Sequence, residues 1–284
     1  MMSGSCQPVE TAGGLTRAGH DPARAFRTMP AIGTQVRVRR EGGIAWTTLD
    51  RPPLNVLNIA LMDELDETLA DLMDDRALRL IVLEGAGRAF SAGVDVGEHL
   101  GDQIGPMLDA FARVAVRLID GDVPVMAVVQ GAALGGACEL VALCDLAIVA
   151  DDAKIGVPEI TLAVVPPVGA AFFPGTIGRQ RAAALVLTGE PVSGAEAAAW
   201  GLVWKSVPAS DLRAEAERVA SGFDGKSASA LRLARRSLRV SSAELLAAID
   251  RANALSADDL PESADAQEGL RAFLEKRPPR WVHR

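Results

Sequence analysis

The sequence predicts an α/β fold, in which buried strands alternate with amphipathic helices. Three observations support this prediction. Apolar runs alternate with helix-period patterns through the first two thirds of the chain, Gly-rich turns follow the apolar runs, and the C-terminal third shows only helical periodicity. With 284 residues, of which 49% are hydrophobic, the chain is long enough to bury a substantial core. We expect a globular enzyme of one or two domains.

The first 33 residues are predicted to be disordered, because they are rich in Gly, Ala, Thr and Arg and contain no apolar segment. Two explanations are open: a flexible tail, or a start codon assigned too early, with Met29 as the true first residue. A transit peptide fits less well, since Glu10 and Asp21 depart from the acid-poor composition of such peptides.

The folded part is predicted to begin with a hairpin and a strand-helix-strand unit. Residues 34–40 and 44–49 have the pattern of two strands joined by a Glu-Gly-Gly turn. Leucines recur every third or fourth position over residues 60–74, which predicts an amphipathic helix leading into a strand at 78–83.

A second unit of the same kind follows: a helix over 104–119, a strand over 123–129, a helix that opens near Gly136 and a strand over 146–150. Such alternation is typical of right-handed crossovers in a parallel sheet. The stretch 123–150 is apolar overall, but acidic residues and glycines interrupt it. We therefore interpret it as buried core and not as a membrane span.

Beyond about residue 175 the strand pattern stops, and the rest of the chain is predicted to be helical. Ser193 and Glu196 form a capping-box pattern for a short helix that ends at Gly201. Four further helices are predicted at residues 209–222, 226–238, 241–255 and 264–275. We therefore divide the folded part into a core, residues 34–200, and a helical region, residues 201–284.

Charge and residue usage exclude several classes of function. The 37 acidic and 29 basic side chains give a formal net charge of -8, whereas nucleic-acid-binding proteins concentrate Lys and Arg. The three cysteines are too few for a disulfide framework, and the three histidines lack the spacing of metal ligands. We expect a cytoplasmic protein that needs no metal and binds neither nucleic acid nor membranes.

Three turns, each after an apolar strand, concentrate the residues suited to chemistry: 88–95, 131–139 and 153–160. In the second, paired glycines open a helix whose first N–H groups are free to bind negative charge. Glu139 lies in the first turn of that helix beside an apolar run, so its carboxylate is predicted to be buried, and buried acids usually serve a function. The third turn sets Glu159 between a proline and an isoleucine.

These three segments, in this order and spacing, resemble the enoyl-CoA hydratase/isomerase (crotonase) superfamily, from about residue 35 to the C-terminus. Residues 49–55, 144–145 and 268–277 extend the resemblance. It implies a crotonase-like ββα spiral core, a C-terminal helical region that mediates trimerisation, and a homotrimer or homohexamer. It also implies an acyl-CoA thioester as substrate, with no other cofactor.

The resemblance implies the site as well. The backbone N–H groups of Val94 and Gly136 would form an oxyanion hole for the thioester carbonyl, where fixed donors in a dry pocket stabilise enolate-like charge. Glu139 is assigned to take a proton from water and Glu159 to protonate the α-carbon, a division that stays open between the two. The alternatives are a tight turn without a ligand for the glycines and a structural role for one glutamate.

Two residues depart from the pattern of the resembling hydratases. Pro167 occupies the position of a backbone N–H near the catalytic water, and proline has no such donor. Gly97 stands where a lysine is common. The resemblance leaves Arg51, Ala92 and, from a neighbouring subunit, Lys276 as contacts of coenzyme A, with solvated surface charge as the alternative for the two cations.

The segments 95–103 and 273–277 are most similar to the cyclohexa-1,5-diene-1-carbonyl-CoA hydratases, which act on an alicyclic dienoyl thioester in the breakdown of aromatic compounds. Two other functions stay open: a 3,2-enoyl-CoA isomerase, which moves a proton without adding water, and a non-catalytic binding protein of the same fold. His99 is interpreted either as a pocket residue or as a bystander on a surface turn, and Phe172 and Phe173 either as pocket walls or as core.

Overall fold

The computed structural model describes residues 34–238, 242–259 and 263–283, and these belong to one compact unit that begins at Thr34. The segment predicted to be disordered, residues 1–33, lies outside the described residues, and so does Met29. No helix within the described ranges is long and apolar enough to cross a membrane.

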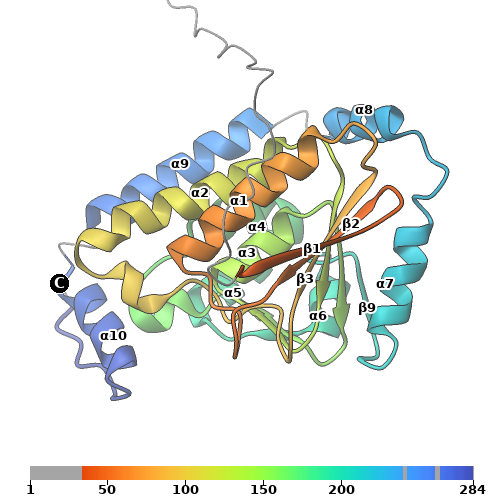
Figure 1. Cartoon of the computed structure of the whole chain (residues 1–284). Helices are drawn as coiled ribbons and strands as arrows, with labels where there is room; N and C mark the ends of the chain where they lie inside the picture. Colours follow the sequence, from red (N-terminus) through yellow and green to blue (C-terminus); the bar gives the residue numbers. More distant parts are fainter. Residues whose placement is uncertain (1–33, 239–241, 260–262, 284) are drawn as a thin grey trace, which may run out of the picture. The chain divides into compact units, whose positions relative to one another are not determined.

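Six strands form the central sheet, in the order β1-β2-β3-β4-β6-β9 (Figure 1). β1 and β2 are the predicted hairpin and pair antiparallel, whereas the other neighbouring strands pair in parallel. β4 is buried along its whole length, which fits its uninterrupted apolar sequence. The bounds are β1 Val36–Glu41, β2 Ile44–Leu49, β3 Leu80–Gly85, β4 Val125–Val129, β6 Leu146–Ala150 and β9 Lys205–Val207.

A second, three-stranded sheet contains parts of the Gly-rich turns. It consists of β5 (Ala132–Leu134), β7 (Lys154–Gly156) and β8 (Val192–Ser193), of which β5 and β7 are parallel. An isolated bridge between Ser91 and Ala133 joins the first turn to β5. Main-chain pairing thus brings the three predicted turns to one place.

Three long helices, α1 (Ile59–Asp74), α2 (Ile104–Asp120) and α9 (Ser242–Asp259), run side by side (Figure 1). α1 begins where the Asn58 side chain accepts a hydrogen bond from the Leu61 N–H, and its regularly spaced leucines are buried. The first two of these helices confirm the predicted amphipathic pattern.

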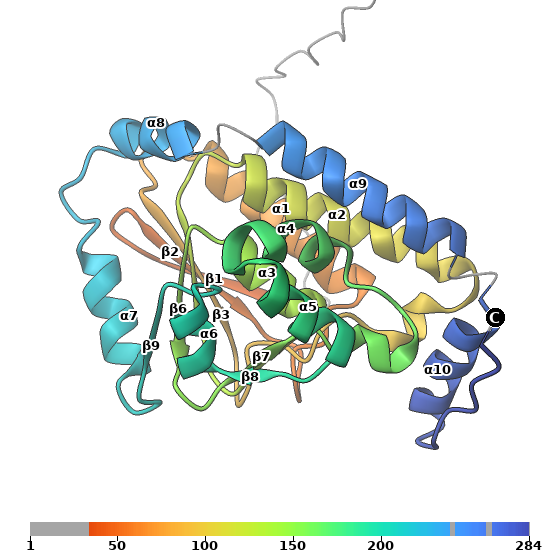
Figure 2. The same cartoon turned by 180° about the vertical axis from the view of Figure 1, so that it is seen from behind.

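The other helices confirm most of the predicted helical segments and add two. α6 begins at the predicted capping box of Ser193 and Glu196. The two helices that the sequence does not predict are α4 and α5, seen from behind in Figure 2. Prolines at the start of α4 and inside it argue against a helix there. The bounds of these other helices are α3 Gly136–Leu143, α4 Pro167–Ile177, α5 Arg179–Thr188, α6 Gly194–Trp200, α7 Leu212–Ser221, α8 Ala228–Leu238 and α10 Ala264–Leu274. The short 3-10 segments are η1 Val96–His99, η2 Gly101–Gln103 and η3 Pro158–Leu162.

Two strands show that the prediction of no strands beyond residue 175 is wrong. β8 and β9 both lie past that point, and β9 falls in the region predicted to be helical. β9 extends the central sheet by pairing in parallel with β6. Strands of two and three residues are too short to show sequence alternation, so the tertiary pairing alone reveals them.

Arg235 joins α8 to the central part of the molecule. Its side chain is 3% exposed, and its Nε lies 2.8 and 2.6 Å from the two carboxylate oxygens of Asp145. The same guanidinium donates to the carbonyl oxygens of Leu118 and Gly121. Asp145 in turn accepts the N–H of Val125 at the start of β4. A side chain of the C-terminal third thereby fixes the edge of two central strands.

An Arg235→Leu variant is expected to lose about 2–3 kcal/mol in free energy of unfolding, because the Asp145 carboxylate is left without its cation; that side chain is 25% exposed, which keeps the loss below that of a fully buried pair. Denaturant unfolding measures the loss. Arg236→Leu is the matched control, since Arg236 is exposed and pairs with Asp122 at the surface, and it should cost no more than about 0.5 kcal/mol. Equal losses in both variants would contradict a structural role for the buried pair.

Candidate active site

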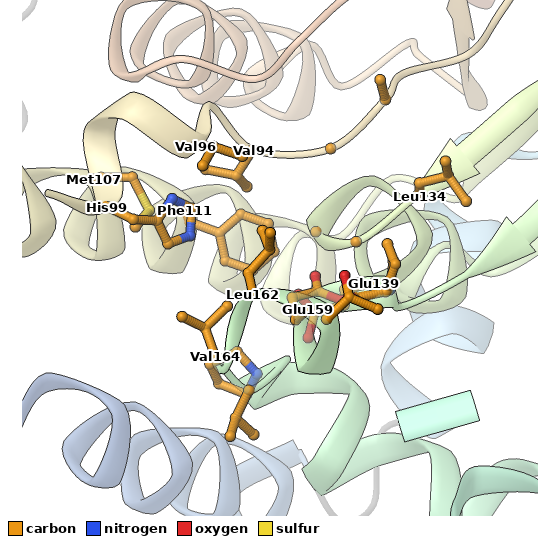
Figure 3. Close-up of a pocket in the computed structure, with 18 of the residues that line it drawn as sticks. Val94, Val96, His99, Met107, Phe111, Leu134, Glu139, Glu159, Leu162 and Val164 are labelled. Atoms are coloured by element: carbon orange, nitrogen blue, oxygen red, sulfur yellow. The ribbon is translucent and has the colours of Figure 1, made fainter. Parts of the chain in front are cut away.

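The three predicted turns surround one cavity of about 340 Å³ (Figure 3). Its walls come from the loop before η1, from η1 itself, from α2, from the first turn of α3, from η3 and from the start of α4, and Phe273 of α10 closes one side. Most lining side chains are apolar; the polar ones are Glu139, Glu159, His99 and Thr161. The cavity therefore has a largely apolar lining, in which charged groups interact more strongly than in water.

The backbone at Val94 is oriented by its neighbours. The Leu57 N–H donates to the Gly93 carbonyl, and the Asp95 N–H donates to the Leu57 carbonyl. In such a parallel bridge the amide of the intervening residue points away from the partner strand, so the Val94 N–H is directed to the other side. Gly93 is required here, because its φ is 104° and a Cβ would lie 2.8 Å from the Leu134 oxygen.

Gly136 supplies the second amide, as the first residue of α3. The first N–H groups of a helix have no acceptor within the helix, so this donor is available. A Cβ on Gly136 would lie 2.7 Å from Cγ2 of Val94 and 2.8 Å from Cε2 of Phe111, which shows how closely the two amide-bearing residues pack. Among the described residues neither amide has a hydrogen-bond acceptor. The two donors can therefore bind a carbonyl oxygen of a ligand.

Glu139 lies in the first turn of α3 and is 2% exposed, as its sequence predicts. Its Oε1 accepts a hydrogen bond of 2.6 Å from the Gly169 N–H at the start of α4. Burial raises the pKa of Glu139 to about 7, while the N–H groups of Gly169 and Val168 act in the opposite direction by favouring the carboxylate.

Glu159 lies in η3 beside Glu139 (Figure 3). Its carboxyl group lies against Gly135. A Cβ on Gly135 would lie 2.7 Å from Oε1 of Glu159, so glycine is needed at that position. Oε2 of Glu159 is buried without a hydrogen-bond partner. Burial and the neighbouring Glu139 charge raise the pKa of Glu159 to about 8.

The surroundings of Glu139 and Glu159 differ, and the difference gives the two carboxyl groups different affinities for a proton. Backbone N–H groups stabilise the ionised form of Glu139, whereas no donor from another residue stabilises Glu159. A shared proton therefore favours Glu159, and the pair can act as one base and one acid at the same time.

Pro167 and His99 both line the cavity. Pro167 brings no N–H, and the next two amides of α4 are directed to Glu139 instead. Of the two interpretations of His99, the pocket residue is confirmed. Phe173 is fully buried in the core, and Phe172 packs against that core outside the cavity lining, so the interpretation of these rings as core is confirmed.

The three predicted coenzyme A contacts are not brought together. Ala92 lines the cavity. Arg51 lies outside the lining, where it donates to the Val56 carbonyl at 3.1 Å and faces Asp95 at 3.7 Å. Lys276 is exposed just after α10, a helix that packs on η1 and η3 of its own chain. The contacts of Arg51 and Lys276 with coenzyme A stay predictions.

Several apolar walls of the cavity were not identified from the sequence. They share no motif and come from three separate elements and one loop: Met107, Phe111, Leu162, Val164 and Phe273. The helical period of α2 marks its buried face, but a buried face gives no signal that distinguishes a cavity wall from core.

The profile of the enoyl-CoA hydratase/isomerase family matches residues 39–284. This chain belongs to that family. A relative from Mycobacterium bovis, named a probable enoyl-CoA hydratase, is 37% identical over 88% of this chain and 98% of its own length. The cyclohexa-1,5-dienecarbonyl-CoA hydratase of Thauera aromatica is 35% identical over 88% of this chain and 97% of its own length. A crystal structure of an enoyl-CoA hydratase from Mycobacterium avium subsp. paratuberculosis K-10 matches with a TM-score of 0.79 and 26% identity, over 87% of this chain and 98% of that chain.

The family membership confirms the predicted superfamily, and the α/β architecture with these neighbours confirms the crotonase-like fold class. The protein is accordingly a hydratase-type enzyme, and an acyl-CoA substrate is consistent with its family.

Proposed function

We propose that this family member adds water across a conjugated double bond of an enoyl- or dienoyl-CoA thioester. The observation that carries the proposal is the juxtaposition, in one apolar cavity, of two buried carboxyl groups with different surroundings and two backbone amides without acceptors. Each of these groups has a use in conjugate addition to a thioester.

In this mechanism the N–H groups of Val94 and Gly136 bind the thioester carbonyl oxygen and stabilise the negative charge that develops there. The carboxylate of Glu139 takes a proton from water while the water oxygen forms a bond to the β-carbon. The carboxylic acid of Glu159 gives its proton to the α-carbon. The protons balance when the one gained by Glu139 returns to Glu159, after which the pair is ready for another turnover.

For the acyl group we propose cyclohexa-1,5-diene-1-carbonyl-CoA as the specific candidate. Two observations support it: the similarity to the Thauera aromatica protein, and a cavity whose lining is apolar apart from four side chains. Pro167, which offers no amide to a water, fits a pocket that differs from that of a hydratase for short linear chains.

Turnover in heavy-oxygen water tests the proposed function. Crotonyl-CoA and cyclohexa-1,5-diene-1-carbonyl-CoA are incubated with the enzyme side by side, and mass spectrometry follows the product. We expect a gain of one labelled water and faster turnover of the cyclic diene. A product of unchanged mass would indicate a 3,2-enoyl-CoA isomerase instead, and faster turnover of crotonyl-CoA would overturn the proposed acyl group.

The activity should show a bell-shaped dependence on pH. kcat/KM is expected to rise as Glu139 loses its proton near pH 7 and to fall as Glu159 loses its proton near pH 8. A kcat/KM profile that is flat up to pH 9 would contradict these assignments.

The same two groups make the stability of the fold depend on pH. Both pKa values are raised in the folded state, so the folded protein holds protons that the unfolded chain releases above about pH 4.5. The contribution of these two groups to stability is therefore present at low pH and lost as pH rises towards 8.

We also propose that Arg51 and Lys276 contact the phosphates of coenzyme A and that the protein assembles as a homotrimer or homohexamer in the cytoplasm. Exposed apolar side chains near the C-terminus, among them Leu274 and Trp281, support an assembly. Light scattering coupled to size exclusion measures the oligomer, and a monomer at working concentration would contradict it.

A further inference from the structure

The cavity lining contains two polar side chains that the proposed reaction does not use, His99 and Thr161. The hydrogen-bonding capacity of Thr161 is already satisfied, because its hydroxyl donates to the Pro158 carbonyl at 2.7 Å. The two glutamates serve the reaction itself. His99 thus presents a hydrogen-bonding group to an otherwise apolar wall.

The hydrogen bond of the imidazole decides what it can offer to a ligand. Nδ1 of His99 lies 2.9 Å from the carbonyl oxygen of Asp95, and a carbonyl can only accept, so Nδ1 carries a hydrogen. Burial lowers the pKa of His99, against the opposing effects of that carbonyl and of the Asp95 charge, so the ring is neutral at pH 7. Its Nε2 is therefore an acceptor, and it has no partner among the described residues.

The position of His99 and the charges of the cavity lining limit which ligand groups its Nε2 can bind. His99 lies beside Met107, and Phe111 lies between it and the two glutamates (Figure 3). The imidazole is thus away from the reacting atoms. The lining contains no Lys or Arg, so a carboxylate at this end of the cavity would meet a lone pair and no cation. A neutral hydroxyl would instead donate to Nε2 and satisfy it.

We propose that His99 determines substrate specificity, with Nε2 accepting a hydrogen bond from a hydroxyl group on the acyl portion, remote from the thioester. Within a matched pair of neutral enoyl thioesters, linear or cyclic, the member that bears a hydroxyl is then preferred to its unsubstituted form. This inference rests on the proposed function and narrows its substrate class.

The test compares kcat/KM for three 2-enoyl-CoA thioesters of equal chain length that end in a methyl, a hydroxymethyl or a carboxylate group, and for the cyclic dienoyl thioester with and without a ring hydroxyl. In at least one of these matched sets the wild type should prefer the hydroxyl to the unsubstituted form by up to about tenfold, and should disfavour the carboxylate by more. His99→Leu should abolish the preference for the hydroxyl. His99→Gln, whose amide oxygen can accept, should restore part of it.

His283→Leu removes a histidine outside the cavity lining and should leave the ratios unchanged. If the wild type shows no preference for a hydroxyl in either set, or if His99→Leu preserves the preference while all thioesters are hydrated, the specificity role is wrong and the proposed function stands. If no thioester gains water with the wild type, the proposed function is wrong and this inference falls with it.

Discussion

The variants Glu139→Gln and Glu159→Gln are each expected to lose at least about a hundredfold in kcat while keeping the fold. Glutamine has nearly the same size as glutamate, and its side-chain oxygen can still accept the Gly169 N–H that holds position 139. It cannot exchange a proton at neutral pH, so one of the two proton transfers loses its catalyst. Initial rates on a saturating enoyl-CoA thioester measure the loss.

Glu67→Gln is the control for these two variants, since Glu67 is exposed on α1 outside the cavity lining and undergoes the same chemical change. It should leave kcat at the wild-type value. In the double variant the loss should be smaller than the product of the two single losses, because the groups act as a unit. Full activity in both single variants would end the two-carboxylate mechanism.

A Gly136→Ala variant is expected to lose about 10²- to 10³-fold in kcat, the effect of removing an oxyanion donor. Its Cβ would lie 2.7 Å from the Val94 side chain and 2.8 Å from the Phe111 ring, so both must shift. The two amides then no longer converge on one oxygen atom. The loss should appear in kcat more than in KM, because the carbonyl gains its charge only as the reaction proceeds.

Gly105→Ala provides the comparison for this substitution. Gly105 lies on α2, and a Cβ there meets no atom within 4 Å, so the change should leave kcat unaltered and slightly raise stability. Thermal unfolding of both variants separates a catalytic effect from a loss of fold. Normal kcat in a well-folded Gly136→Ala protein would contradict the expected displacement of the amide at 136.

Local signals in the sequence were sufficient to single out two acidic side chains that line the cavity, whereas their proposed roles come from the family resemblance. Glu139 follows paired glycines at the start of an apolar helix, and Glu159 follows a proline after a short apolar run, so each is marked by its neighbours in the chain. Parallel pairing of β5 with β7 then brings the two turns together. The burial of Glu139 and its place in the first turn of α3 agree with the prediction.

The rest of the site depends on contacts between distant segments, which leave no local pattern. Phe273 enters the cavity from α10, and nothing in its own segment indicates that η3 is its neighbour. β9 joins β6 although it is only three residues long. The unpaired Nε2 of His99 depends on the carbonyl of Asp95 being in reach of Nδ1, which only the folded η1 determines.

The pairing of Arg235 with Asp145 has a consequence for synthesis on the ribosome. Ninety positions separate the two residues, and at roughly 5–20 residues per second the carboxylate emerges some 5–20 seconds before its cation. During that interval the edge of β4 and β6 carries a negative charge that cannot be buried at low cost. The nascent core is therefore less stable until α8 has been translated, and a chain that stops near residue 200 lacks the cation that pairs with Asp145.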